Sequence, residues 1–92
     1  MNQREIFVAE KYKQEGWSTL RNGAPDFIML KVNNNNITDM MAIEVKSENG
    51  KLSYEQSIWK MICEKAQIPY RVEVVKQKEI PLIKEEGVNK KL

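Results

Sequence analysis

Two acidic residues and a lysine lie on or beside two apolar segments of this chain. Asp26 immediately precedes the apolar run Phe27–Val32, and Glu44 and Lys46 stand near the end of a second run. Successive side chains of a strand alternate between faces, so Glu44 and Lys46 would share one face. If the two runs pair as a hairpin, Asp26 comes close to Glu44.

Two close carboxylates repel each other unless a cation lies between them. Mg²⁺ takes oxygen ligands and is usually held by one or two carboxylates together with phosphate oxygens and water. Lys46, on the same face, would neutralise charge on a phosphate or position an attacking water, while the metal acts as a Lewis acid. The pattern predicts a metal site for phosphodiester hydrolysis. The alternative is a solvated strand face, and against it stands Glu44, which interrupts an apolar run where a buried carboxylate is costly.

The residues that are missing exclude several other chemistries. The chain has no histidine and a single cysteine, Cys63. Ser-His-Asp and Cys-His catalysis and histidine metal sites are therefore excluded, and zinc binding is disfavoured. Cys63 cannot form an internal disulfide, and neither a signal peptide nor an apolar run of membrane length is present. We expect a cytoplasmic protein (of the host cell if it is viral) that needs no membrane and no nucleotide cofactor.

Length and composition indicate one small domain over residues 1–92. The chain has 41% apolar and 30% charged residues, which is typical of a folded protein. Its net charge of +2 is too small to indicate nucleic-acid binding by itself. Any basic surface must come from local clustering of lysine and arginine.

The first 21 residues predict a helix and a strand. Residues Asn2–Glu15 form the helix, with Asn2 as N-cap and Gly16 as its end. Glu5 lies on this helix, and its default role is a solvated position or a local ion pair. Trp17–Arg21 reads as a strand whose apolar residues would face the helix. The apolar stripe expected on the helix consists of Ile6, Phe7, Ala9 and Tyr12.

A turn that contains Gly23 and Pro25 leads into the predicted hairpin. Its strands are Phe27–Val32 and Ile37–Lys46, joined by a turn at Asn33–Asn36. This turn has a second interpretation as a loop that contacts substrate. Arg21, just before Gly23, is equally well explained as a surface charge or as a phosphate contact.

The second half of the chain predicts a helix and a strand. Ser53 and Gln56 match a capping box, so Gln56 has a structural explanation with which a functional role must compete. Tyr70–Val75 follows as a strand, and the strand–helix–strand passage favours its parallel pairing with the Ile37–Lys46 strand. A short helix is expected near Lys78–Ile83, and residues 85–92 form a polar tail. The apolar stripe of the second helix is Ile58, Trp59, Ile62, Cys63 and Ala66, with Trp59 and Cys63 expected in the core.

The predicted fold is α/β, in the order α-β-β-β-α-β, with a mixed sheet and flanking helices. This order and the motifs on the hairpin resemble the restriction-endonuclease-like core of the PD-(D/E)xK nuclease superfamily, over about residues 3 to 76. The chain is most similar to the small virus-type VRR-NUC nucleases and is also similar to archaeal Holliday-junction resolvases. The matching motifs are Gly23-Ala24-Pro25-Asp26, Glu44-Val45-Lys46, Gly50-Lys51-Leu52-Ser53 and Gln56.

The resemblance implies a DNA endonuclease that depends on Mg²⁺ or Mn²⁺. The metal would be held by Asp26, Glu44 and the backbone carbonyl of Val45, with Glu5 assisting directly or through water. Glu5 corresponds to a glutamate that lies about three turns before a Gly-aromatic pair in the resolvases. Lys46 would orient or activate the attacking water. Gln56 would support the active site from the second helix.

The resemblance also implies a homodimer that cuts branched DNA such as Holliday junctions, because two sites on a two-fold axis match a junction with paired scissile strands. Met61 and exposed apolar residues around the last strand are the expected interface. Three alternatives remain: a nuclease subunit of a larger viral or mobile-element complex, a non-catalytic nucleic-acid-binding relative, and, less favoured because no residues remain for a sequence-reading domain, a restriction endonuclease. A non-catalytic relative would lack Asp26, Glu44 or Lys46, and all three are present.

Overall fold

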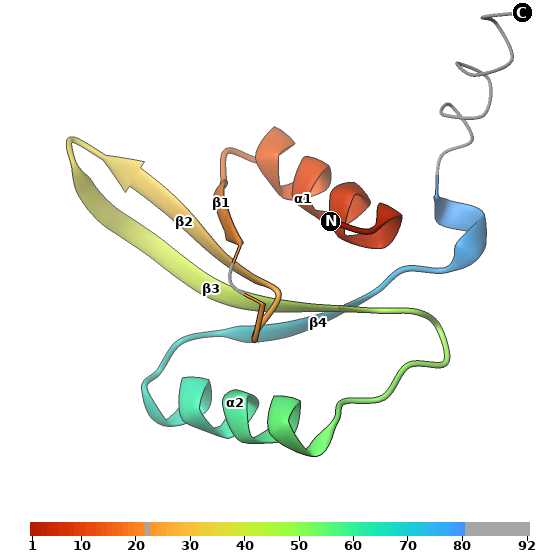
Figure 1. Ribbon diagram of the computed structural model, residues 1–92. Coiled ribbons are helices and arrows are strands. Elements are labelled where there is room, and N and C mark those ends of the chain that lie inside the picture. The colour runs from red at the N-terminus through yellow and green to blue at the C-terminus, as the bar shows by residue number, and fades with distance from the viewer. Residues whose placement is uncertain (22, 81–92) are drawn as a thin grey trace, which may run out of the picture.

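A four-stranded mixed sheet separates the two α-helices of the chain (Figure 1). The computed structural model describes residues 1–21 and 23–80. The order of elements confirms the predicted α/β fold, with a restriction-endonuclease-like core. The elements are α1 (Gln3–Gln14), β1 (Ser18–Arg21), β2 (Phe27–Asn33), β3 (Asn36–Lys46), α2 (Tyr54–Lys65), β4 (Tyr70–Val74) and the 3-10 helix η1 (Gln77–Glu79).

The strands lie in the order β1-β2-β3-β4. The first two pairings are antiparallel, and β3 pairs with β4 in parallel, as the intervening helix predicted. The turn of the β2–β3 hairpin also lies where it was expected. Asn34 and Asn35 have φ values of 53° and 66°, and asparagine tolerates this left-handed region better than most residues.

Helix α1 covers one face of the sheet and contributes to the core there. Asn2 caps it, and Glu5 completes the capping box, as the sequence indicated for Asn2. The fully buried residues of the helix are Val8 and Tyr12, four positions apart. The predicted stripe had missed Val8, and its members Ile6, Phe7 and Ala9 are only half-buried. The core cluster on this face consists of Val8, Tyr12, Phe27, Met29, Met41, Ile43, Val75 and Ile80.

Polar contacts hold α1 against β4 and the segment that follows it. The Tyr12 hydroxyl donates a hydrogen bond to Glu73, and the Arg71 guanidinium donates one to the Tyr12 oxygen at 2.8 Å. Arg4 Nε donates to the Val75 carbonyl at 2.9 Å. These contacts fix the position of α1 over β3 and β4.

Helix α2 lies on the opposite face and covers it less completely (Figure 1). Its capping box of Ser53 and Gln56 is confirmed. The predicted apolar stripe is only partly in the core: Cys63 is buried, Trp59 is half-buried and Ile62 is 48% exposed. The reason is that α2 packs mainly along β4, an edge strand, so the outer side of its stripe has no sheet beneath it.

Strand β1 departs from the prediction at one position. Trp17, just before it, packs against the core on the α1 side, but Leu20 is 55% exposed. The two residues are three apart, so strand alternation places them on opposite faces.

The predicted tail 85–92 lies outside the described residues, as does part of Lys78–Ile83. Within residues 1–21 and 23–80, no helix is long and apolar enough to cross a membrane.

Candidate active site

Asp26 lies where the chain enters β2, beside the end of β3. Pro25, which precedes it, is buried, and the Ala24–Pro25 peptide bond is cis. Asp26 Oδ2 accepts a hydrogen bond of 2.8 Å from the backbone N–H of Val45. The hairpin therefore brings Asp26 to the Glu44–Lys46 segment, as the sequence predicted.

Glu44 is 1% exposed and is the only charged side chain in the described part of the chain that is fully buried. Strand alternation separates it from Ile43, which lies in the core on the α1 face, so Glu44 points toward α2. Gln56 Nε2 donates to Glu44 Oε1 at 3.1 Å. The Tyr70 hydroxyl donates to Oε2 at 3.3 Å. Each carboxylate oxygen therefore has its own donor, which fixes the orientation of the group.

Burial raises the pKa of Glu44 to about 7, and a hydrogen bond with Asp26 and the negative charge of Asp26 act in the same direction. The hydrogen bond from Tyr70 and the positive charge of Lys46 lower the pKa of Glu44 and only partly offset these effects. Burial and the neighbouring Asp26 therefore both favour the protonated form of Glu44 when no cation is present. A bound cation would replace that proton.

The backbone carbonyl of Val45 lies on the same side of β3 as Asp26. The carbonyl of the next residue, Lys46, accepts a hydrogen bond from Val75, just beyond β4, at 2.8 Å. Backbone groups of successive strand residues point to opposite neighbours, so those of Val45 point away from β4. The hydrogen bond from its N–H to Asp26 agrees with this direction.

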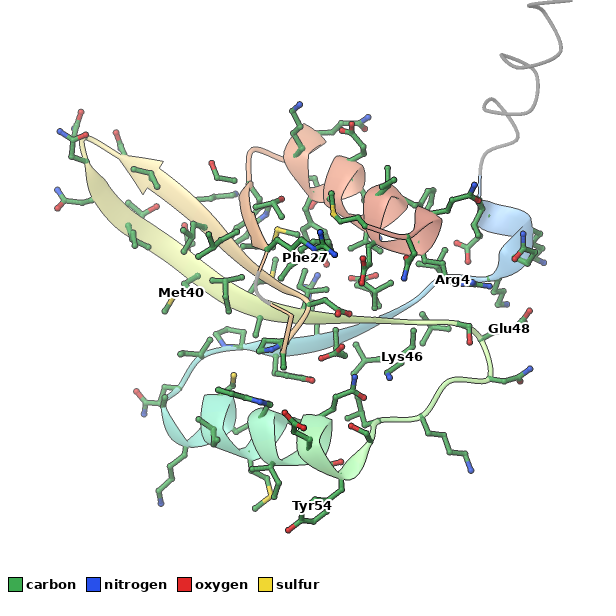
Figure 2. The ribbon with its side chains drawn as sticks, viewed as in Figure 1. Arg4, Phe27, Met40, Lys46, Glu48 and Tyr54 are labelled. Atoms are coloured by element: carbon green, nitrogen blue, oxygen red, sulfur yellow. The ribbon has the colours of Figure 1, made fainter. Side chains whose placement is uncertain are left out.

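Lys46 ends β3 on the same face as Glu44, and Figure 2 shows it between the sheet and the start of α2. Gly50 lies against its side chain. A Cβ atom at Gly50 would come within 3.2 Å of both Cβ and Cδ of Lys46. The absence of a side chain at Gly50 therefore leaves room for Lys46 in its present position.

The donor atoms at this site fit Mg²⁺ or Mn²⁺, because Asp26, Glu44 and the Val45 carbonyl offer oxygen only. Glu5 is placed elsewhere: its carboxylate accepts a hydrogen bond of 3.1 Å from the backbone N–H of Asn2, in the cap of α1. Among residues 1–21 and 23–80, no group of three or more acidic or cysteine side chains is arranged to hold a metal ion. The structure therefore brings Asp26 and Glu44 together as a pair, without Glu5.

Tyr70 is the member of the site that the sequence analysis missed. It is the first residue of β4 and pairs with Ala42, two residues before Glu44 on the same face. Parallel pairing of β3 and β4 was predicted, but a contact with Glu44 depends on the register. The only signal in the sequence for this contact was a tyrosine at the start of a strand predicted to neighbour the Glu44 strand.

The model of the VRR-NUC domain family matches residues 3–78 of the chain. This range contains every residue of the site described above. No curated protein matches the chain, and no solved structure does.

Proposed function

The chain belongs to the VRR-NUC domain family of nucleases, within the PD-(D/E)xK superfamily, and we propose that it is a metal-dependent DNA endonuclease. The observation that carries this proposal is the pair of the buried Glu44 and the half-buried Asp26 beside Lys46. A non-catalytic relative would have no need for a carboxylate pair whose repulsion is relieved only by a proton or a cation.

In the proposed mechanism, Asp26, Glu44 and the Val45 carbonyl would hold Mg²⁺ or Mn²⁺. The bound cation would supply Lewis-acid activation of the phosphate and lower the pKa of a water molecule. The Lys46 ammonium would orient this water or stabilise charge on the phosphate oxygens. Gln56 and Tyr70 keep the Glu44 oxygens in place through their hydrogen bonds.

We further propose that the working unit is a homodimer that prefers branched DNA such as a Holliday junction. The surface formed by α2 and β4 is the region expected for the interface, and it exposes several large apolar side chains. Burial of such side chains against a second copy would stabilise a dimer. A dimer would also double the phosphate contacts of a monomer whose net charge is only +2. The exposed fractions are 62% for Met61, 48% for Ile62, 40% for Val72 and 48% for Val74.

The test is a comparison of four DNA substrates: a four-way junction, a flap, a single strand and a linear duplex. Each is incubated with the protein and Mg²⁺, Mn²⁺ or EDTA at the same salt concentration. We expect cleavage only with metal, and fastest cleavage of the junction. Cleavage of none of the four would refute the nuclease proposal. Equal cleavage of junction and duplex by a protein that sediments as a monomer would leave a nuclease without selectivity for branched DNA.

A further inference from the structure

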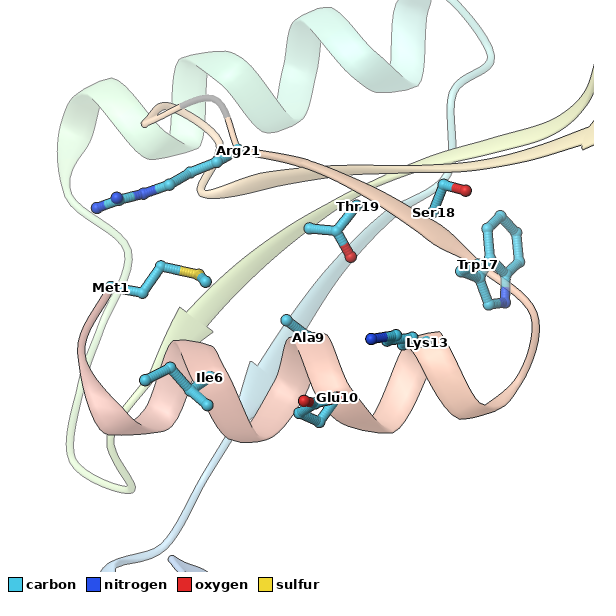
Figure 3. A pocket seen from close by; sticks show the side chains of 9 residues that line it. All are labelled: Met1, Ile6, Ala9, Glu10, Lys13, Trp17, Ser18, Thr19 and Arg21. Carbon is cyan, nitrogen blue, oxygen red and sulfur yellow. The ribbon is translucent and has the colours of Figure 1, made fainter. Parts of the chain in front are cut away.

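A groove of about 490 Å³ runs between α1 and the edge strand β1 (Figure 3). Because β1 is the last strand on its side of the described sheet, the groove is open along that edge. Neither wall of the groove, the α1 wall or the β1 wall, includes a residue of the Asp26–Glu44 site. The groove-lining side chains that carry the argument below are Ile6, Ala9 and Lys13 of α1, and Trp17, Thr19 and Arg21 of β1 and the turn before it.

The groove exists because α1 packs over the middle of the sheet. Val8 and Tyr12 turn into the core, so the adjacent stripe of the helix faces β1 and forms the other wall of the groove. On the strand, the Thr19 hydroxyl donates to Met29 Sδ at 3.3 Å, and Met29 lies in the α1-side core. Alternation then places Trp17 and Arg21 on the same face as Thr19.

The chemistry of the walls matches an unpaired nucleic-acid strand. Lys13 and Arg21 are exposed cations, and Glu10 is the only acidic side chain among the lining residues. The ammonium of Lys31 lies 4.7 Å from the centre of the Trp17 ring, which adds a third positive charge beside an aromatic surface. Proteins that bind single strands combine a basic groove along the backbone with aromatic rings on which bases stack.

One end of the groove lies at the same end of the sheet as the proposed active site, although the groove is on the α1 face and Glu44 points toward α2. Arg21 pairs directly with Phe27, the residue after Asp26. From Trp17 to Arg21 the strand extends about 13 Å at roughly 3.3 Å per residue. One strand of a duplex has a phosphate about every 3.4 Å along the helix axis, and an unpaired, extended strand spaces them more widely, so fewer than about four phosphate spacings fit this length. A strand at Asp26 can therefore reach the groove by passing around this end of the sheet.

We propose that this groove binds an unpaired segment of the DNA strand whose phosphate lies at the Asp26–Glu44 site. Arg21 and Lys13 contact its phosphates. A base stacks on Trp17 in the place that Lys31 takes in the free protein, and Lys31 moves to a phosphate. The proposal rests on the nuclease function proposed above, and it concerns branched substrates with an unpaired arm, such as a flap, because a fully paired four-way junction would leave the groove empty.

Binding is tested without cleavage, with a fluorescent 12-nucleotide oligothymidylate and the full chain in EDTA, at several salt concentrations. The double variant Lys13→Ala/Arg21→Ala removes two groove charges. The matched control Lys60→Ala/Lys65→Ala removes two exposed charges from α2. We expect the groove variant to bind at least tenfold more weakly, with a salt slope smaller by about 1.4, because each lost phosphate contact on a single strand contributes about 0.7. Equal weakening by both variants would overturn the proposal.

Tryptophan fluorescence gives a second readout. The chain has two tryptophans, so Trp59→Phe leaves Trp17 as the only one. We expect the oligonucleotide to quench Trp17 emission in this variant, and to leave emission unchanged in Trp17→Phe, which retains Trp59. If Trp17 emission instead changes with protein concentration and not with oligonucleotide, the groove is a contact between copies of the chain, and the proposal is wrong.

Cleavage assays separate this proposal from the proposed function. If the parent protein cuts none of the DNA substrates with Mg²⁺ or Mn²⁺, the nuclease proposal fails, and oligonucleotide binding in EDTA still tests the groove. If the parent cuts a flap substrate and the Lys13→Ala/Arg21→Ala variant cuts it equally fast, the groove proposal fails while the nuclease function stands.

Discussion

Gln56 and Glu44 are joined by a hydrogen bond of 3.1 Å from the amide Nε2 to the carboxylate Oε1. The other end of the same amide completes the α2 cap, because Gln56 Oε1 accepts a hydrogen bond of 2.8 Å from the backbone N–H of Ser53. One side chain therefore connects the start of α2 to a proposed metal ligand. The two roles that competed in the sequence use different atoms of the amide.

Substitution of Gln56 by glutamate separates these roles. Glutamate can complete the cap, but it lacks the N–H that Glu44 accepts, and we expect cleavage to slow by about 10- to 100-fold. At pH 5, where Glu44 holds a proton, the free energy of unfolding of Gln56→Glu in urea should match that of the parent. Ser53→Ala is the opposite control: it should lower the free energy of unfolding by about 1 kcal/mol and largely preserve the rate. An unchanged rate in Gln56→Glu would leave the residue with a capping role alone.

The carboxylate pair itself should be required for cleavage and dispensable for folding. Asp26→Asn and Glu44→Gln are each expected to lower the cleavage rate by roughly 10²- to 10³-fold or more. Each removes a carboxylate ligand of the metal, and with it the stabilisation of charge that develops on the phosphate. The metal-free stability of both variants should hold or rise slightly, since the substitution relieves repulsion. Asp39→Asn and Glu48→Gln make the same changes at exposed positions and serve as controls. Full cleavage by Asp26→Asn with Mg²⁺ would contradict the site assignment.

The raised pKa of Glu44 predicts how stability depends on pH in EDTA. Because the folded state holds this proton more tightly than the unfolded chain, the contribution of Glu44 is fully present below pH 4.5. It is lost as the pH rises from there through about 7. Urea titrations of the parent and Glu44→Gln across this range should agree most closely at low pH and diverge toward neutral pH, with the parent falling relative to the variant. Parallel curves would show that Glu44 does not titrate in this window. Saturating Mg²⁺ should abolish the fall if the cation replaces the proton.

The sequence predicted the parts of the site that depend on local structure. Alternation along β3 placed Glu44 and Lys46 on one face, and the asparagine turn implied the hairpin that brings Asp26 to them. Both signals extend over a few residues, and no distant contact is needed to interpret them. The capping role of Gln56 was predictable for the same reason.

Features that depend on register or on the position of a helix were not predictable. Tyr70 reaches Glu44 only because β4 pairs with β3 in one register. Leu20 was assigned to the wrong face because the short strand β1 does not alternate in polarity. Val8 was missed because the direction in which α1 faces the sheet decides which residues of its apolar side are buried. Long-range packing determines all three features, and such packing leaves little signal in a single sequence.

Tyr70→Phe tests the residue that only the structure revealed. Phenylalanine keeps the ring and removes the hydroxyl that donates to Glu44 at 3.3 Å. We expect the metal concentration needed for half-maximal cleavage to rise by about tenfold, because Glu44 loses an orienting donor. Tyr54→Phe removes a hydroxyl from a side chain that is 83% exposed and should change nothing. If the two variants respond to Mg²⁺ alike, the contact between Tyr70 and Glu44 has no part in holding metal.

Gly50 offers a test of Lys46 that leaves every proposed active-site group in the chain. In Gly50→Ala, the new Cβ lies 3.2 Å from two carbons of the Lys46 side chain and from the Ser47 carbonyl oxygen, so the lysine and the adjacent backbone must shift by a few tenths of an ångström. A displacement of this kind lowers the rate without removing a charge, and we expect cleavage to slow by about tenfold while metal affinity stays as in the parent. Asn49→Ala, at the neighbouring exposed position, is the control for changes to the loop itself. Single-turnover cleavage across a Mg²⁺ titration separates rate from affinity. If Gly50→Ala cuts as fast as Asn49→Ala, the position of the Lys46 side chain does not limit the reaction.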